Sequence, residues 1–379
     1  MDLLTHRQHP ALQPIWGRLS SRRNLLLSSR IRSLIAITAF ALFASSCTAF
    51  TWGTTLGAHT PTADAGGDWT SVTVGGGHSC RIDSDKALWC EGDSTYGQVG
   101  HGSTVEAEDY VQIAAANWRA VEASQASTCG IQLDRTLWCW GNNEVGQVGD
   151  GTTTDRLAPV QVGSDNTWRQ VDGGFGHYCA TRTDDSMWCW GWDIGFQPDG
   201  ETIDAVTAPV QVGGNDWKQA IAADTHSCAI KTDSTLWCWG VDIAGVTGHG
   251  PSLDPVYPSP RQVGTSADWL VVEGEFDYTC GVKTDRSLWC WGAFNSSIPE
   301  SEVPVQIGIE TNWLTAAGGT NTACAIKTDL SLWCWGRNGD GQVGDGTTID
   351  RPLPVLVGSG PFLAVDVAWT SQALALGPS

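Results

Sequence analysis

The stretch Cys228-Ala-Ile-Lys-Thr-Asp-Ser-Thr-Leu-Trp-Cys-Trp-Gly240 predicts a β-hairpin. From Cys228 to Thr232 the side chains alternate with a period of two, which is typical of a strand. The polar run that follows supplies turn residues. Leu236 to Trp239 then forms a second strand, rich in large apolar groups. Because the same pattern occurs six times along the chain, we expect a repeat protein.

Two cysteines, ten positions apart, lie at the ends of each copy. Zinc ligands would instead lie two to four residues apart and need a second cluster. In an exported protein the spacing favours a disulfide across each hairpin, which contributes about 3 kcal/mol. The alternative is free buried thiols in a reducing compartment. The predicted pairs are Cys80–Cys90, Cys129–Cys139, Cys179–Cys189, Cys228–Cys238, Cys280–Cys290 and Cys324–Cys334.

A tryptophan opens each copy, and the steps between these residues are 49, 50, 49, 52 and 44. A period near fifty with four strand-like pieces per period is the signature of an all-β propeller. The composition agrees, because 45 glycines and only 16 % charged residues suit many short strands and tight turns. The opening tryptophans are Trp69, Trp118, Trp168, Trp217, Trp269 and Trp313.

These copies resemble the regulator of chromosome condensation repeat family, in its bacterial, disulfide-bearing branch. The resemblance runs from residue 69 to about 376 and rests on Gly75-Gly-Gly-His-Ser-Cys80, the Trp-Cys-Trp-Gly runs, and Gly146-Gln-Val-Gly-Asp-Gly, which returns at Gly341. It implies a seven-bladed propeller over 69–379. Since six copies are complete, we expect the seventh blade to combine a C-terminal half copy with residues 47–68, which otherwise form a linker. Six blades are the alternative.

Residues 1–46 predict an export signal. Arginines precede the apolar run Leu34–Ala44, and small residues follow. Ala44-Ser-Ser-Cys47 resembles a bacterial lipoprotein signal, in which Cys47 would carry the lipid; simple secretion is the alternative. We therefore expect an outer-membrane or cell-surface lipoprotein, or else a periplasmic or secreted protein, that meets the membrane only through its anchor.

The formal charge of −20 argues against nucleic-acid binding, which needs basic residues. We expect no catalytic residue, metal or cofactor. The histidines two positions before a cysteine, at 78, 177 and 226, are interpreted as structural. The aspartates at 85, 134, 184, 233, 285 and 329 are expected to bond the backbone of their own turns. The family usually has glycine after them, so the residues here are expected to be strained if left-handed.

Function is predicted to be non-enzymatic binding of a protein or envelope component by a monomer, through loops that vary on a rigid frame. The resemblance also allows inhibition of a secreted enzyme or guanine-nucleotide exchange. A metal-dependent lyase or hydrolase is a further alternative. Most tryptophans are expected in the core. The candidate contact residues in the loops are Tyr96, Asn142, Asn143, Trp192, Phe196, Arg337 and Asn338.

Overall fold

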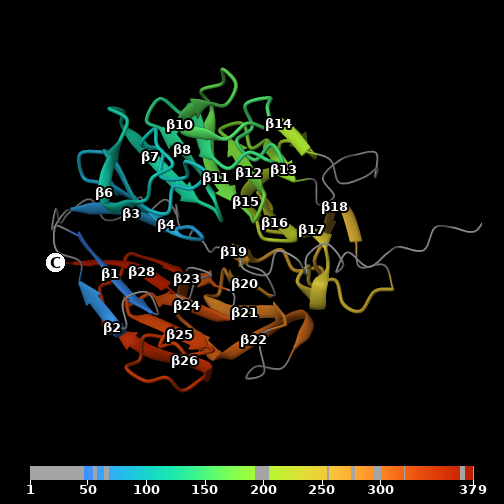
Figure 1. Ribbon diagram of the computed structural model, residues 1–379. Helices are drawn as coiled ribbons and strands as arrows, with labels where there is room; N and C mark the ends of the chain where they lie inside the picture. Colours follow the sequence, from blue (N-terminus) through green and yellow to red (C-terminus); the bar gives the residue numbers. More distant parts are fainter. Residues whose placement is uncertain are drawn as a thin grey trace, which may run out of the picture.

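The computed structural model is almost entirely β-structure, arranged as a ring (Figure 1). It describes residues 47–53, 58–63, 68–192, 205–253, 256–274, 278–293, 300–319, 321–367 and 372–378. The predicted export signal lies outside these ranges. One short 3₁₀ turn, η1 (Ile243–Gly245), interrupts the strands. Within the described residues, no helix is long and apolar enough to span a bilayer.

Seven four-stranded antiparallel sheets form the blades, so the alternative of six blades is wrong. The innermost strands are β3 (Trp69–Val74), β7 (Trp118–Ala123), β11 (Trp168–Gly173), β15 (Trp217–Ala222), β19 (Trp269–Gly274), β23 (Trp313–Gly318) and β27 (Ala364–Val367). The second strands are β4 (His78–Asp83), β8 (Ser127–Gln132), β12 (His177–Arg182), β16 (His226–Lys231), β20 (Tyr278–Lys283), β24 (Thr322–Lys327) and β28 (Gln372–Pro378).

The third strands are β5 (Leu88–Gly92), β9 (Leu137–Gly141), β13 (Met187–Trp192), β17 (Leu236–Val241), β21 (Ser287–Gly292), β25 (Leu332–Gly336) and β1 (Cys47–Gly53). The outermost strands are β6 (Ala107–Ile113), β10 (Arg156–Gln161), β14 (Ala205–Val212), β18 (Val256–Gln262), β22 (Ser301–Thr311), β26 (Arg351–Gly358) and β2 (Ala58–Ala63). We number the blades 1 to 7 from β3 to β27.

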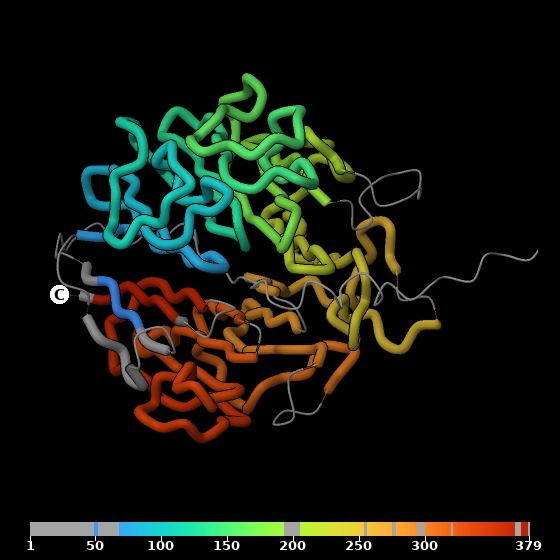
Figure 2. Tube along the Cα trace, in the orientation of Figure 1, coloured from blue at the N-terminus to red at the C-terminus, as the bar shows by residue number. Residues whose placement is uncertain are grey.

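The innermost strands contact one another all the way around, from β3 through β27 and back to β3. The ring is therefore closed. Blade 7 orders its strands β2-β1-β28-β27, so both ends of the chain build it, as the sequence predicted. In Figure 2 the blue N-terminal segment lies beside the red C-terminal one. This arrangement pairs strand edges that an incomplete last blade would leave exposed.

The six predicted disulfides are all present, one in each of blades 1 to 6. In each pair the two cysteines lie directly opposite each other on the second and third strands, as Cys228 and Cys238 do. Their Cα atoms are 4.1 Å apart. An antiparallel non-hydrogen-bonded pair brings Cα atoms to about this distance, so the hairpin register positions the cysteines.

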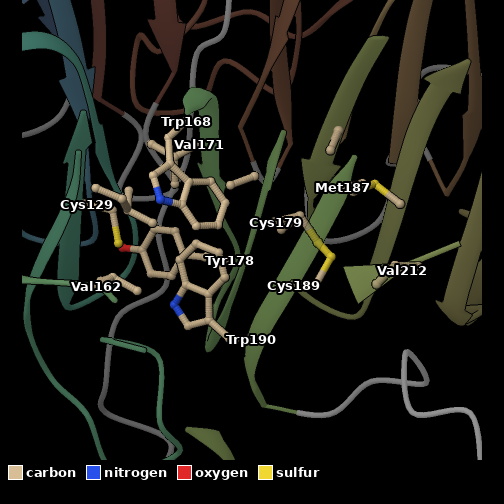
Figure 3. Packing of buried hydrophobic residues seen from close by; sticks show 14 of the residues in the cluster. Cys129, Val162, Trp168, Val171, Tyr178, Cys179, Met187, Cys189, Trp190 and Val212 are labelled. Atoms are coloured by element: carbon tan, nitrogen blue, oxygen red, sulfur yellow. A yellow bond between two sulfur atoms is a disulfide. The ribbon is translucent and has the colours of Figure 1, made fainter. Parts of the chain in front are cut away.

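Aromatic rings fill the space between neighbouring blades, as Figure 3 shows between blades 2 and 3. Trp168 and Trp190 of blade 3 meet edge to face at 6.2 Å, and Tyr178 stacks on Trp190 at 5.8 Å. All three are buried against the Cys129 side of blade 2. The prediction that most tryptophans belong to the core is confirmed, and such rings bury large apolar areas.

Basic residues at the end of the second strand add to this packing. Lys231 lies 4.8 Å from the ring centre of Trp217 and 4.5 Å from that of Trp237. Arg182, Lys283 and Lys327 take the same place in blades 3, 5 and 6. Cation–π contact explains why a charged residue ends an otherwise buried strand.

Candidate functional site

The two faces of the ring carry different connections. One face, here the turn face, holds the hairpins between second and third strands, such as residues 232–235. The opposite face, here the loop face, holds the long connections from third to fourth strands, such as 142–155. The candidate contact residues that the structure describes lie in or beside the long connections. The loop face is therefore the candidate binding surface.

The hairpins of the turn face are built alike. Asp233 Oδ1 accepts hydrogen bonds from the backbone N–H and the hydroxyl of Thr235, at 3.0 and 2.6 Å. That hydroxyl oxygen accepts from Trp237 Nε1 at 2.9 Å. The hydroxyl of Thr235, followed by its N–H, lowers the pKa of Asp233 below its ordinary value. The predicted turn role of the aspartates is confirmed in blades 2 to 6, where Asp134, Asp184, Asp285 and Asp329 form the same bonds.

Blade 1 departs from this pattern. Ala87 there offers no hydroxyl, and Asp83 takes over both bonds, accepting from Ala87 N at 2.8 Å and from Trp89 Nε1 at 2.9 Å. The expectation that Asp85 holds this turn is therefore wrong. The tryptophan N–H keeps a carboxylate or hydroxyl acceptor in either case, because a half-buried donor needs one.

The residue after each turn aspartate is left-handed, which is the case for which strain was expected. Lys86, Arg135, Asp185, Ser234, Arg286 and Leu330 have φ between 60° and 69°. Five of their carbonyls accept the N–H of the tryptophan that opens the next blade, and the carbonyl of Leu330 accepts from Phe362 N at 2.8 Å. The strained turn thus links neighbouring blades.

The histidines near the loop face also join blades. His78 Nε2 lies 2.8 Å from Thr128 Oγ1 of blade 2, and that hydroxyl donates to Gln98 O at 2.8 Å. Because the hydroxyl proton is used, Nε2 is the donor. Burial lowers the pKa of His78 to about 4, against an opposing effect of Asp93. His177 and His226 make equivalent contacts, with Ser227 and Thr279, so the structural interpretation is confirmed.

The long connections of blades 2 and 6 are closed around a buried asparagine. Asn143 Nδ2 donates to Thr152 O and Thr154 O, each at 3.0 Å, and its Oδ1 accepts from Val148 N at 2.9 Å. Asn338 makes the corresponding bonds in blade 6. Both amides are fully buried. These two candidate contact residues therefore shape their loops and do not reach the surface.

Each of these loops also contains an aspartate paired with an arginine. Burial alone would raise the pKa of Asp150, but hydrogen bonds from Thr152 and Arg156 outweigh it and lower the pKa. Arg156 Nε donates to Asp150 Oδ2 at 2.6 Å. Arg351 and Asp345 repeat the pair in blade 6. The near-identity of the two segments therefore reflects a shared internal bonding scheme.

The Gly-Gln-Val-Gly part of the connection supports the next blade. The carbonyl of Gln147 accepts from Trp190 Nε1 at 2.9 Å, and Gln98 does the same for Trp140. A side chain at Gly149, where φ is 77°, would lie 2.7 Å from the Trp190 ring. Val246 replaces glutamine in blade 4 and keeps the bond through its backbone. This explains the repeated motif without a ligand.

The remaining candidates occupy different surroundings. Arg337 is exposed, and Tyr96 and Asn142 are half-buried. Trp192 is half-buried with its ring 6.3 Å from that of Phe175. Phe196 lies outside the described residues. Sequence reasoning did not single out four exposed apolar side chains in the long connections, because exposure is not marked by the repeat pattern: Val105, Ile243, Leu253 and Ile349.

Buried acids near the axis have a structural use. Asp172 Oδ1 accepts from Ala222 N of the next inner strand at 2.8 Å, and Asp366 Oδ2 accepts from Val74 N at 2.8 Å. Thr73 does the same for Ala123 N. Among the described residues, no three side chains of histidine, cysteine, aspartate or glutamate form a group suited to a metal.

The regulator of chromosome condensation (RCC1) repeat model matches residues 135–181 and 331–370, which confirms the resemblance for these segments. Human WBSCR16 is similar in structure, with a TM-score of 0.76 and 16 % identity over 88 % of this chain and 99 % of that one. Prp20p from Saccharomyces cerevisiae has a TM-score of 0.78 and 16 % identity over 92 % and 95 %. Yeast RCC1 (Prp20) bound to Kap60 has a TM-score of 0.77 and 15 % identity, over 95 % of this chain and 92 % of that one.

At these identities the likeness establishes the fold and not an activity. A comparison with curated protein sequences finds no match. The chain therefore contains RCC1 repeats on a seven-bladed propeller, with six disulfides that indicate folding in an oxidising compartment.

Proposed function

We propose that this protein is a non-enzymatic scaffold, exported and anchored through Cys47, that binds a protein or envelope component on its loop face. The observation that carries the proposal is that the two faces of the ring have different roles. The turn-face hairpins are committed to holding the blades together. The long connections all leave the opposite face, and there the copies differ in length and sequence.

Exposed apolar side chains support the choice of this face. Val105 and Ile349 are 69 % and 63 % exposed, and Leu253 is fully exposed. They come from the long connections of blades 1, 6 and 4, so the exposed apolar side chains are spread over three blades of the loop face. Protein interfaces commonly use such apolar anchors on a rigid frame.

Export is supported by the disulfides and the predicted signal. A disulfide in each of blades 1 to 6 suits a protein that folds outside the cytosol. Nucleotide exchange is less well supported, although a structural neighbour, Prp20p, is reported to bind Gsp1p and histones. Stimulated release of nucleotide from a small GTPase by the purified chain would favour exchange over the scaffold.

Affinity capture from the native envelope tests the scaffold. The full chain carrying Val105→Asp, Leu253→Asp and Ile349→Asp should lose a specific partner by tenfold or more, because charges in an interface core are costly. The matched control is Leu133→Asp, since Leu133 is 51 % exposed on the turn face. Equal capture by both variants would show that the loop face does not bind the partner.

A further inference from the structure

We infer that the turn face of blades 5 to 7 lies against a lipid bilayer, with the loop face pointing away from it. This inference rests on the anchoring part of the proposed function. It concerns a patch formed by Leu270, Leu314, Leu363, Leu330, Ile309 and Leu356, which we call the leucine patch.

The first part of the patch comes from one repeated position. A bulge follows the opening tryptophan of every complete blade, so that the next residue is unpaired at the turn-face end of the inner strand. In blades 1 to 4 that residue is polar or basic: Thr70, Arg119, Arg169 and Lys218. In blades 5 and 6 it is Leu270 and Leu314, and in blade 7 Leu363 follows the opening Phe362 without a bulge.

The change divides the face into two sectors. Leu363 is 45 % exposed, whereas Leu270 and Leu314 are half-buried. The three inner strands are consecutive around the ring, because β19 contacts β23 and β23 contacts β27. Three neighbouring blades therefore carry leucine at a position of the turn face where the other four carry polar or basic residues.

Three more apolar residues belong to the leucine patch. Leu330 lies in the hairpin of blade 6, and its carbonyl bonds Phe362 N, directly before Leu363. Ile309 is 92 % exposed near the turn-face end of β22, and Leu356 is 50 % exposed near that of β26. Large apolar groups held at such exposure are costly in water and mark a contact surface.

The position of Cys47 indicates what covers the patch. Cys47 pairs with Pro378, at the end of β28 that faces the turn side, whereas Gly53 pairs with Gln372 at the loop side. The predicted lipid would thus be attached at the turn face of blade 7, the face and blade that also carry Leu363. Because β1 begins at Cys47 itself, the described strand leaves no spacer between anchor and ring.

Charges around the patch are compatible with lipid headgroups. Glu310 is paired with Lys327 at 2.6 Å. The hydroxyl and N–H of Ser331 lower the pKa of the exposed Asp329, which therefore stays charged and would lie among the headgroups, not in the apolar layer. Arg119 and Lys218 are exposed on the remaining sector of the face. Interfacial binding combines a shallow apolar contact with such basic residues, which meet anionic headgroups.

Depth-dependent quenching tests this orientation. The full chain would be purified with a fluorescent amino acid at position 363 or 309, or at 119 or 218, and placed in vesicles of phosphatidylethanolamine and phosphatidylglycerol with brominated chains. We expect strong quenching at 363 and 309 and at least threefold weaker quenching at 119 and 218. Equal quenching at all four positions, or none, would overturn the inference.

A second measurement removes the anchor. Cys47→Ser protein should still bind these vesicles weakly, and adding Leu363→Lys and Ile309→Lys should reduce the bound fraction about tenfold, since apolar burial supplies the attraction. Leu133→Lys, elsewhere on the turn face, should leave it unchanged. If the patch variant binds as Cys47→Ser does, the surface is not a membrane contact.

These results separate the inference from the proposed function. The mass of the Cys47 peptide reports lipidation, and capture by the loop face reports the partner. Lipidated protein without the quenching contrast would contradict the orientation alone. Quenching at 363 and 309 in a chain whose Cys47 is unmodified would retain the membrane contact and remove the anchor from the proposed function.

Discussion

Blade 7 and blades 1 to 6 join their second and third strands in different ways. In blades 1 to 6 one hairpin supplies the second and third strands, and a disulfide joins them. In blade 7 these strands come from opposite ends of the chain, and Leu374 lies opposite Thr51 where the others have two cysteines. Both residues are buried. The closing blade thus holds by packing and hydrogen bonds alone.

The neighbouring surface of blade 1 differs as well. Where later blades have tryptophan in the third strand, blade 1 has Glu91, and Arg81 lies 4.2 Å from the centre of the Tyr110 ring. Ser79 Oγ lies 2.7 Å from Tyr110 Oη. Burial raises the pKa of Tyr110 well above its ordinary value. The boundary that closes the ring is therefore more polar than the others, and we expect unfolding to begin there.

A disulfide in blade 7 would supply the cross-link that blades 1 to 6 have, and it should raise the stability of the fold more than the other changes below. Thr51→Cys with Leu374→Cys places two cysteines in direct register and closes nearly the whole chain into one loop. Chain entropy predicts stabilisation of up to about 5 kcal/mol. Thermal unfolding checks this against Leu374→Cys alone. If the bond forms and the melting temperature is unchanged, unfolding starts in another blade.

Loss of the hydrogen bond between blades 7 and 1 should produce the second largest change in stability. Asp366→Ala leaves the buried Val74 N–H without its acceptor and should cost about 3 kcal/mol. Thr73→Ala removes the corresponding acceptor of Ala123 N at the boundary of blades 1 and 2 and should cost about 1–2 kcal/mol. Urea unfolding compares them. A larger loss from Thr73→Ala would contradict a weak closing blade.

Lowering the pH should weaken the boundary between blades 1 and 2, which His78 bridges, and not the closing boundary. The pKa of His78 is about 4 in the folded chain, below the ordinary 6.5, so the unfolded chain binds the proton more tightly. The free energy of unfolding is therefore highest above pH 6.5, where His78 is neutral in both states. It is lower by roughly 2 kcal/mol at pH 5, and the decline levels off below about pH 4. His78→Ser should flatten the decline in urea unfolding between pH 7 and 5. An unaltered slope would place the titration elsewhere.

Relief of turn strain should have the smallest effect. Arg135→Gly and Leu330→Gly remove a side chain from a left-handed residue, where φ is 68° and 64°. Each should raise stability by about 1 kcal/mol, reduced by the greater freedom of glycine in the unfolded chain. Differential scanning calorimetry checks both. A gain at Arg135 without one at Leu330 would show that unfolding near the closing blade limits the measurement.

Much of the candidate site could not be predicted from the sequence. Loop residues such as Asn143 appeared variable and polar, and polar residues in loops usually face water. The structure buries the Asn143 side chain because three backbone groups of its own loop need its amide. In contrast, the exposure of Val105 and Leu253 has no signal in the local sequence, because exposure depends on neighbours that are distant in the chain.

The sequence by itself determined the repeat, the cysteine pairs and the use of both termini in one blade. These features depend on local periodicity, on spacing across a single hairpin, and on a count of strands. Only the tertiary structure decided which face each connection occupies and that leucines from three neighbouring blades lie on the same face as Cys47. Such groupings arise when the ring closes, because closure brings together residues whose separation along the chain carries no pattern.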